Sequence, residues 1–186
     1  MAEVILIGGS AGAFNCIISI LKGIDRSLDI PIVVILHRLK NAETNFESIL
    51  KMNTHYTVKE IEDKEPIQRG MLYTAPPDYH VFLEEDRTLS LDVSEAVNYS
   101  RPSIDVIFES FSLVLKEKCM GILLSGANGD GAKGLQLMAE LNGTTVIQDC
   151  IEADFNNMPK AAKARYKQHQ ELTIENIIKL LNNEYK

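Results

Sequence analysis

The stretch Val4-Ile5-Leu6-Ile7-Gly8-Gly9-Ser10-Ala11-Gly12 sets the interpretation of the whole chain. Its four apolar residues predict a buried strand, and the small residues that follow predict a sharp turn into a helix. Residues 8–12 have the pattern Gly-x-Ser-x-Gly. A serine on such a turn needs small neighbours, because the backbone must fold tightly around it while its hydroxyl stands clear of the sheet. Ser10 is therefore a candidate functional residue.

Two further apolar runs end beside side chains of related chemistry. Ile32–Leu36 is followed by His37, and Gly121–Leu124 opens into a glycine-rich loop that contains Asp130. In a parallel sheet the carboxyl ends of the strands share one edge, which is where α/β proteins place their sites. The sequence therefore predicts that Ser10, His37 and Asp130 meet at one edge of the sheet.

The rest of the chain alternates short apolar runs with amphipathic segments. This alternation predicts an α/β domain with a doubly wound, mostly parallel sheet, helices on both faces and a small antiparallel addition within residues 70–91. We expect a single domain over residues 1–186. The expected strands cover residues 4–7, 32–36, 57–60, 119–124 and 144–147, and the expected helices cover about 13–21, 43–52, 104–115, 134–141, a stretch from 159, and 174–181.

Composition excludes several classes of function. The net charge of −7 argues against nucleic acid as a partner, which would favour a basic surface. No apolar stretch reaches the roughly 18 residues needed to span a bilayer. The chain enters a strand at once, so we expect no signal peptide and a cytoplasmic protein with reduced cysteines. The four histidines lack metal-ligand spacing, so no metal site is expected, and His55 and His169 are predicted at the surface.

Serine, histidine and aspartate are the residue types of a nucleophilic triad. An imidazole removes the proton of a weakly nucleophilic hydroxyl, and a carboxylate orients that imidazole. The chain order Ser10, His37, Asp130 differs from the serine, acid, histidine order of α/β-hydrolases, which excludes that family. Each residue also has a plainer interpretation. The glycine turn could cradle a phosphate, His37 could simply end a strand, and Asp130 could be a turn residue and helix cap.

The glycine-rich loop Ser125–Gly131 has a second possible use. It precedes a predicted helix, so its backbone N–H groups can point toward a site at the sheet edge. Such donors stabilise the oxyanion that forms when a serine attacks a carbonyl.

Five ordered motifs make the chain similar to a known family. Over nearly its whole length it resembles the catalytic domain of CheB-type chemotaxis protein-glutamate methylesterases. The run Arg101-Pro102-Ser103-Ile104-Asp105 is especially specific, because no general rule of folding requires it. The matching stretches are Ile7–Gly12, Val34–His37, Ala75–His80, Ser100–Asp105 and Leu124–Ala132.

The resemblance implies an activity, a mechanism and a set of roles. It implies hydrolysis of γ-glutamyl methyl esters on the cytoplasmic helices of transmembrane chemoreceptors, with release of methanol through an acyl-enzyme, and deamidation of certain receptor glutamines. No metal or organic cofactor is implied. Ser10 would be the nucleophile, His37 the general base and acid, and Asp130 the orienting carboxylate. The expected oxyanion-stabilising or substrate-binding residues are Ala11, Gly126, Ala127 and His80.

The chain also departs from the family pattern. Ala11-Gly12-Ala13 replaces the usual Thr-Gly-Gly, Gly126-Ala127-Asn128 replaces Gly-Met-Gly, and Arg38 replaces a methionine. Arg101 and Asp105 are expected to form an ion pair or a helix cap. No receiver domain precedes Met1, so we expect a free-standing enzyme or an excised catalytic domain, with a separate receiver domain or protein as a candidate partner. The alternative is a catalytically weakened binding module that docks on a receptor or signalling partner.

Overall fold

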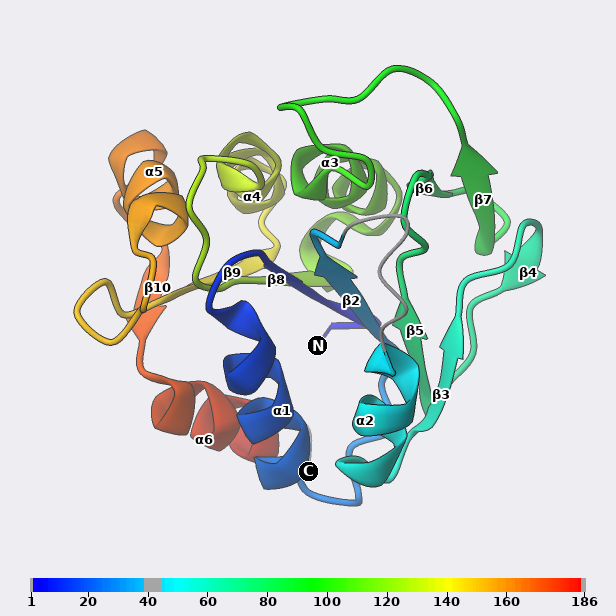
Figure 1. Cartoon of the computed structure of the whole chain (residues 1–186), viewed down its shortest axis with the longest axis horizontal. Coiled ribbons are helices and arrows are strands. Elements are labelled where there is room, and N and C mark those ends of the chain that lie inside the picture. Colours follow the sequence, from blue (N-terminus) through cyan, green and yellow to red (C-terminus); the bar gives the residue numbers. More distant parts are fainter. Residues whose placement is uncertain (1, 39–44, 185–186) are drawn as a thin grey trace.

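A seven-stranded parallel sheet forms the centre of the computed structural model, which describes residues 2–38 and 45–184 (Figure 1). Its strand order is β10-β9-β8-β1-β2-β5-β3, and every neighbouring pair is parallel. The predicted α/β class is thereby confirmed. The strands are β1 (Val4–Gly9), β2 (Ile32–Leu36), β3 (Thr57–Glu60), β5 (Met71–Thr74), β8 (Cys119–Leu123), β9 (Thr144–Gln148) and β10 (Gln170–Leu172).

Helices cover both faces of the sheet, as the sequence predicts. In Figure 1, α1 (Ala13–Gly23), α2 (Phe46–Met52) and α6 (Ile174–Glu184) lie below the sheet, and α3 (Ile104–Leu115), α4 (Ala132–Glu140) and α5 (Asn157–Arg165) lie above it. Successive residues of β1 enter opposite cores: Ile5 and Ile7 pack toward α1 and α6, whereas Val4 and Leu6 pack toward α3. Because both faces are buried, the strand sequence is continuously apolar rather than alternating.

The prediction for residues 70–91 is partly wrong. The strand at 71–74 is β5, which lies in the main sheet and pairs in parallel with β2 and β3. Its residues Leu72 and Tyr73 point to opposite faces and are both buried, which suits an inner strand. The small sheet instead consists of β4 (Glu65–Pro66), β7 (Thr88–Asp92) and β6 (His80–Leu83). The predicted helix at 43–52 is observed from Phe46, and residues 43–44 lie outside the described residues.

Strand register brings the candidate residues to the same level. Gly9 is level with Leu36 of β2, and Gly8 is level with Leu123 of β8. The chain therefore leaves β1, β2 and β8 at one edge, and β1 lies between the other two. From β1 the connections run to β2 on one side, whereas β8 and β9 extend the sheet on the other. Crevices at such reversals of strand order are the usual ligand sites of open α/β sheets.

His169 is buried beside β9, which corrects its predicted surface position, whereas His55 is exposed as expected. Its Nδ1 lies 2.8 Å from Thr145 Oγ1, and among the described residues its Nε2 has no hydrogen-bond partner. Burial lowers the pKa of His169 to about 4, from an ordinary value of 6.5. Below pH 6.5 the unfolded chain thus binds a proton at His169 that the folded protein does not bind until about pH 4.

Stability should therefore fall with acidification between pH 6.5 and about pH 4. The loss attributable to His169 amounts to at most about 3 kcal/mol in the free energy of unfolding, and it is complete below the folded pKa. The free energy of unfolding, measured by urea denaturation at several pH values in this range, should fall less steeply with acidification in the variant His169→Gln. The slope against pH should be smaller by up to about 1.4 kcal/mol per pH unit. Identical slopes in the two proteins would contradict the assignment.

Candidate active site

Ser10 occupies a tight turn between β1 and α1, called here the Ser10 turn (Gly9–Ala13). The Ser10 N–H donates to the Ser125 carbonyl at 2.9 Å, and the Ser10 carbonyl accepts from the Ala13 N–H at 3.0 Å. Gly12 has φ +79°, a conformation that side-chain-bearing residues rarely adopt, and a Cβ at Gly9 would lie 2.4 Å from the Ala13 Cβ. The turn thus requires small residues where the sequence has them. The Ser10 hydroxyl has no hydrogen-bond partner among the described residues, which leaves it available.

His37 follows β2 and faces Asp130. Its backbone N–H donates to the Gly9 carbonyl at 3.3 Å, which places the residue beside Ser10 at the sheet edge. The ring Nε2 lies 2.9 Å from Asp130 Oδ2, and Nδ1 lies 3.5 Å from Ser100 Oγ. An ionised carboxylate only accepts hydrogen bonds, so Nε2 carries the proton and Nδ1 keeps a free lone pair. Nδ1 is therefore the nitrogen that can act as a base.

The buried Asp130 carboxylate is held by donors from the segment that leads into α3. Two donors reach Oδ2 and three reach Oδ1, so the orientation of the carboxylate is fixed. Four of the five donors belong to this segment, residues 98–105, and the fifth is His37. The donors are His37 Nε2 (2.9 Å) and the Ile104 N–H (2.7 Å) to Oδ2, and Asn98 Nδ2 (2.8 Å), Ser103 Oγ (2.8 Å) and the Asp105 N–H (3.2 Å) to Oδ1.

These contacts determine the charge of Asp130. Burial raises the pKa of Asp130, but the hydrogen bonds from His37, Asn98, Ile104 and Ser103 outweigh burial and hold the pKa below its ordinary value of 3.8. The N-terminus of α3, where the helix dipole favours negative charge, lies at the same point. Asp130 is thus ionised at neutral pH, as required of a group that stabilises an imidazolium.

Two backbone N–H groups border the site without an acceptor. Ala11 and Ala127 are exposed, and neither N–H has a hydrogen-bond partner in the described part of the chain. The Ala127 carbonyl accepts from Asn157 Nδ2 at 3.0 Å, which fixes the loop from the other side. The expectation for Gly126 is different: its N–H donates to the Phe155 carbonyl at 2.8 Å and is therefore not available to a substrate.

A family model described as CheB methylesterase matches residues 5–181. The chain belongs to the CheB methylesterase family. The family prediction and the predicted enzyme class are thereby confirmed. The crystal structure of the Thermotoga maritima CheB methylesterase catalytic domain superposes with a TM-score of 0.90 at 27% sequence identity, covering 97% of each chain. This agreement also confirms the fold.

Two curated relatives share an enzyme name but differ in length. A putative protein-glutamate methylesterase/protein-glutamine glutaminase of Leptospira interrogans is 41% identical over 178 residues, which is 96% of this chain and 92% of the relative. Protein-glutamate methylesterase/protein-glutamine glutaminase 2 of Caulobacter vibrioides is 29% identical over 163 residues. In that case the match covers 86% of this chain but only 47% of the relative, so this chain spans about half its length.

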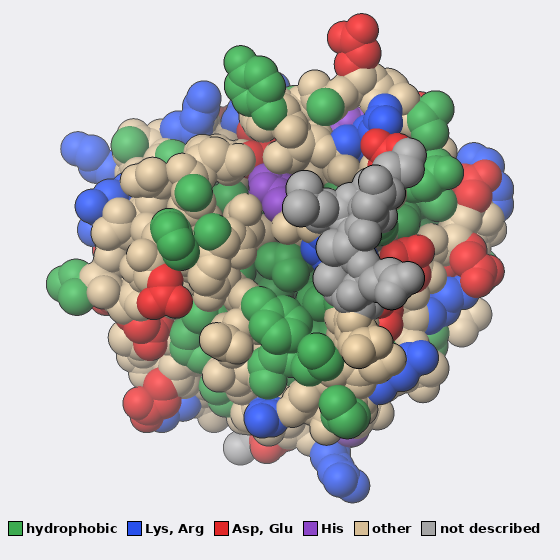
Figure 2. All heavy atoms as spheres, viewed as in Figure 1, with side chains coloured by type: hydrophobic (Ala, Val, Ile, Leu, Met, Phe, Trp, Pro, Cys, Tyr) green, Lys and Arg blue, Asp and Glu red, His purple; other side chains and the backbone are tan. Residues whose placement is uncertain are grey.

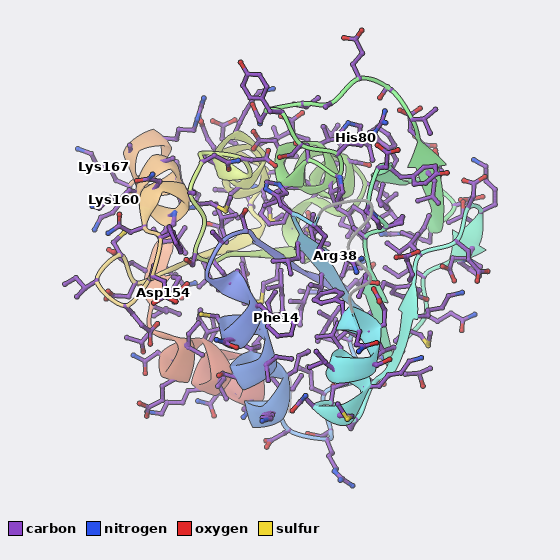
Figure 3. The ribbon with its side chains drawn as sticks, viewed as in Figure 1. Phe14, Arg38, His80, Asp154, Lys160 and Lys167 are labelled. Carbon is purple, nitrogen blue, oxygen red and sulfur yellow. The ribbon has the colours of Figure 1, made fainter. Side chains whose placement is uncertain are left out.

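His80 lies in a motif shared with the CheB family, but it does not lie at the solvent edge. It is 1% exposed, with Nδ1 accepting from the Ser103 N–H at 3.3 Å and Nε2 lying 3.1 Å from the Glu95 carbonyl oxygen. Figure 3 shows it on the β6 side of α3. Both ring nitrogens are occupied within the protein. The expected substrate contact is therefore corrected: His80 supports Ser103, which in turn holds Asp130.

Arg101 and Asp105 do not pair with each other. Arg101 binds Asp78 at 2.6 Å, and Asp105 Oδ1 accepts the N–H groups of Lys133 (2.9 Å) and Gly134 (2.8 Å). Asp105 therefore caps the first turn of α4 rather than its own helix. Burial raises the pKa of Asp105, the bond from Gly134 opposes this, and the nearby Asp130 charge raises it further; the net shift is upward.

A pocket of about 270 Å³ lies beside the triad, lined by His37, Arg38, Tyr99, Ser100, Arg101 and Pro102. Figure 2 shows a histidine side chain at the surface near the middle of this face, with apolar side chains gathered below it. A larger hollow of about 460 Å³ lies at the opposite end of the strands, beyond the C-terminal ends of α1 and α2. None of Ser10, His37 and Asp130 lines this larger hollow. We therefore place the candidate site at the smaller pocket, because of its residues rather than its volume.

Arg38, which replaces a methionine common in the family, points away from the triad. Its guanidinium lies 4.3 Å from the centre of the Phe46 ring and binds Glu47 at 3.0 Å (Figure 3). It also donates to the Ala75 carbonyl at 3.2 Å. Arg38 therefore joins the end of β2 to α2 and β5, and it also forms part of the pocket lining.

Sequence reasoning missed two contacts of the site. Asn98 Nδ2 bridges Asp130 and Asp105 at 2.8 Å each, although no pattern near Asn98 indicates a role. Ser103 was recognised as the start of a helix, and it is the N-cap of α3, but its hydroxyl also donates to Asp130. Its position in a family-like motif was the available signal. Within residues 2–38 and 45–184 there is no cluster of metal-ligating side chains and no helix able to cross a bilayer.

Proposed function

We propose that this protein hydrolyses γ-glutamyl methyl esters on the cytoplasmic helices of chemoreceptors, with Ser10 as nucleophile, His37 as general base and Asp130 as its orienting partner. The contact between His37 Nε2 and Asp130 Oδ2, next to an available serine hydroxyl, is the observation that carries the proposal. The same site would deamidate receptor glutamines, because amide and ester carbonyls form the same tetrahedral intermediate.

The reaction follows from the protonation states of the site. The Ser10 Oγ attacks the ester carbonyl carbon while His37 Nδ1 takes the hydroxyl proton, and the carbonyl oxygen becomes an oxyanion. In this proposal the N–H groups of Ala11 and Ala127, which have no acceptor among the described residues, receive that charge. The C–O bond to methoxide then breaks, His37 returns the proton, and methanol leaves. Water attacks the acyl-enzyme by the same route and releases the glutamyl carboxylate and Ser10.

One arrangement must tighten when substrate binds. The Ser10 hydroxyl must approach His37 Nδ1, which in this structure faces Ser100 at 3.5 Å. Catalytic hydrogen bonds are commonly long without substrate and shorten in the complex. The pocket beside Tyr99 and Arg101 would receive the glutamyl side chain and its flanking helix. We propose a cytoplasmic location on the same ground, since the methylated helices are cytoplasmic.

The wild-type protein provides a direct test. A chemoreceptor cytoplasmic fragment that carries radiolabelled glutamyl methyl esters is incubated with the protein, and volatile methanol is counted. In parallel, a fluorophosphonate is allowed to react and its attachment is mapped by mass spectrometry. We expect methanol release and labelling at Ser10. Binding of the fragment with neither methanol nor labelling would instead support the binding-module alternative.

A further inference from the structure

Ser125 places a fully buried hydroxyl at the junction of three segments. Its Oγ donates to the Ala11 carbonyl at 2.8 Å, with the Phe155 carbonyl at 3.2 Å, and accepts from the Phe155 N–H at 2.9 Å. Its own carbonyl accepts the Ser10 N–H. The Ser10 turn, the loop after β8 and the loop between β9 and α5 thus meet on one side chain.

Ser125 connects the two segments that carry the N–H groups proposed to stabilise the oxyanion. Ala11 belongs to the turn after β1, and Ala127 belongs to the loop after β8, two residues beyond Ser125. An oxyanion hole requires both donors within about 2.7–3.1 Å of one oxygen atom. Their relative placement therefore depends on whatever fixes one loop against the other.

The Ser125 hydroxyl makes the side-chain contact that joins these loops directly. It holds the carbonyl of Ala11, whose N–H has no partner among the described residues, while its own backbone continues through Gly126 into Ala127. The backbone of Gly12 packs against it so closely that a Cβ there would lie 2.6 Å from Ser125 Oγ. A shift of the hydroxyl would therefore be transmitted to the Ser10 turn.

We propose that Ser125 is a positioning residue of the esterase, whose hydroxyl sets the distance between the Ala11 and Ala127 N–H groups. This inference rests on the proposed function, because it assumes an oxyanion at that point. Ser125 does not touch the substrate and acts through the two peptide groups. Displacing such donors by about 1 Å can cost about 100-fold in rate.

The loops themselves should survive loss of the hydroxyl. Gly126 N–H still donates to the Phe155 carbonyl, Met158 N–H still donates to the Gly126 carbonyl, and Asn157 still holds the Ala127 carbonyl. The Ser125 N–H still donates to Gln148 Oε1 at 2.9 Å. Removing the hydroxyl therefore breaks the contact that holds the Ala11 carbonyl, while the backbone bond from Ser10 N–H to the Ser125 carbonyl and the anchors of each loop remain.

The test compares Ser125→Ala and Ser125→Cys with Ser112→Ala. Ser112 is also fully buried and donates to a carbonyl, that of Phe108, but it lies within α3 and outside the site. The cysteine variant retains a group of similar shape that is a weak donor. For each protein, kcat and KM are measured with a small glutamyl γ-methyl ester, per active site titrated by fluorophosphonate. The affinity of a boronic acid, which forms a tetrahedral adduct on Ser10, is measured as well.

Both Ser125 variants should lose about 10- to 100-fold in kcat per titrated site, with little change in KM. Boronate affinity should fall by a similar factor, because the adduct presents its oxygen to the same donors. Ser112→Ala should match the wild type. Unchanged kcat per titrated site in the Ser125 variants, even with fewer titratable sites, would overturn the inference, and if the alanine variant does not fold, the cysteine variant decides. Activity that persists in Ser10→Ala would instead reject the proposed function.

Discussion

Replacing Ser10 with alanine is expected to reduce methanol release from glutamyl methyl esters by roughly 10⁴- to 10⁶-fold. Without the hydroxyl there is no acyl-enzyme, and His37 and Asp130 have no proton to transfer from a nucleophile. What remains is stabilisation of the oxyanion toward attack by water, a minor part of such catalysis. Release of radiolabelled methanol from a methylated chemoreceptor fragment measures this loss directly.

The loss should occur without unfolding. Ser10 is half-buried, and its hydroxyl makes no hydrogen bond to the described residues, so the free energy of unfolding should change by no more than about 0.5 kcal/mol. Ser100→Ala is the matched control, because Ser100 Oγ also lies near His37, 3.5 Å from Nδ1. That variant keeps the proposed nucleophile, so its loss of methanol release should stay within about 10-fold, although Ser100 lines the pocket. An inactive Ser100→Ala beside an active Ser10→Ala would show that the nucleophile has been assigned to the wrong serine.

That the chain leaves β1, β2 and β8 at one edge of the sheet could be predicted, because it depends on topology. Continuous apolar runs identify strands buried on both faces, and parallel strands leave their C-terminal residues at one edge. The register Gly9 to Leu36 then places His37 beside Ser10 without any knowledge of side-chain packing. The same logic fails for β5, because the short run Met71–Tyr73 fits an inner parallel strand as well as a hairpin.

The partners of individual polar side chains could not be predicted, since they depend on packing between distant segments. Arg101 is close to Asp105 in the sequence, yet it binds Asp78, 23 residues away. His80 begins a predicted strand and was a candidate substrate contact, yet it is 1% exposed and its ring contacts Ser103 and Glu95. Asn98 reaches Asp130 across 32 residues, and only the fold brings the two together.

The positions at which the chain departs from the CheB family pattern can also be explained by their contacts. Ala127 changes a side chain but keeps a backbone N–H, which has no partner among the described residues, so the donor that we propose for the oxyanion is still present. Arg38 lines the pocket, and its charge is paired with Glu47 while its guanidinium stacks on Phe46. The substitutions thus alter the surroundings of the triad and leave its three side chains in place.

Asp130→Asn is the second substitution with a large expected effect: kcat should fall by about 10³- to 10⁴-fold. In the wild type both carboxylate oxygens face donors, Ile104 N–H and His37 on one side and Ser103 and Asn98 on the other. An asparagine must turn its NH2 group toward one of these sets. With the NH2 toward His37, the imidazole loses the acceptor that holds its proton on Nε2; with the amide oxygen toward His37, a neutral acceptor replaces the charge that stabilises the imidazolium.

The same substitution should lower the free energy of unfolding by about 1–3 kcal/mol, because at least one buried donor loses its acceptor. The free energy of unfolding of the variant should also depend less on pH. The pKa of Asp130 lies below that of an unfolded carboxyl, so its ionisation stabilises the wild type above the ordinary value of 3.8, and that contribution disappears as the pH falls through the lowered pKa. Urea denaturation at neutral and acidic pH measures both effects.

Asp105→Asn separates catalysis from stability. Asp105 is also buried, also accepts backbone N–H groups and also contacts Asn98, but its side chain does not reach His37. It should therefore lose a comparable amount of stability while each titrated active site keeps its kcat. Equal losses of kcat in the two variants would mean that Asp130 serves the packing of α3 and α4. A loss confined to Asp130→Asn would assign the effect to the hydrogen bond between its carboxylate and the imidazole.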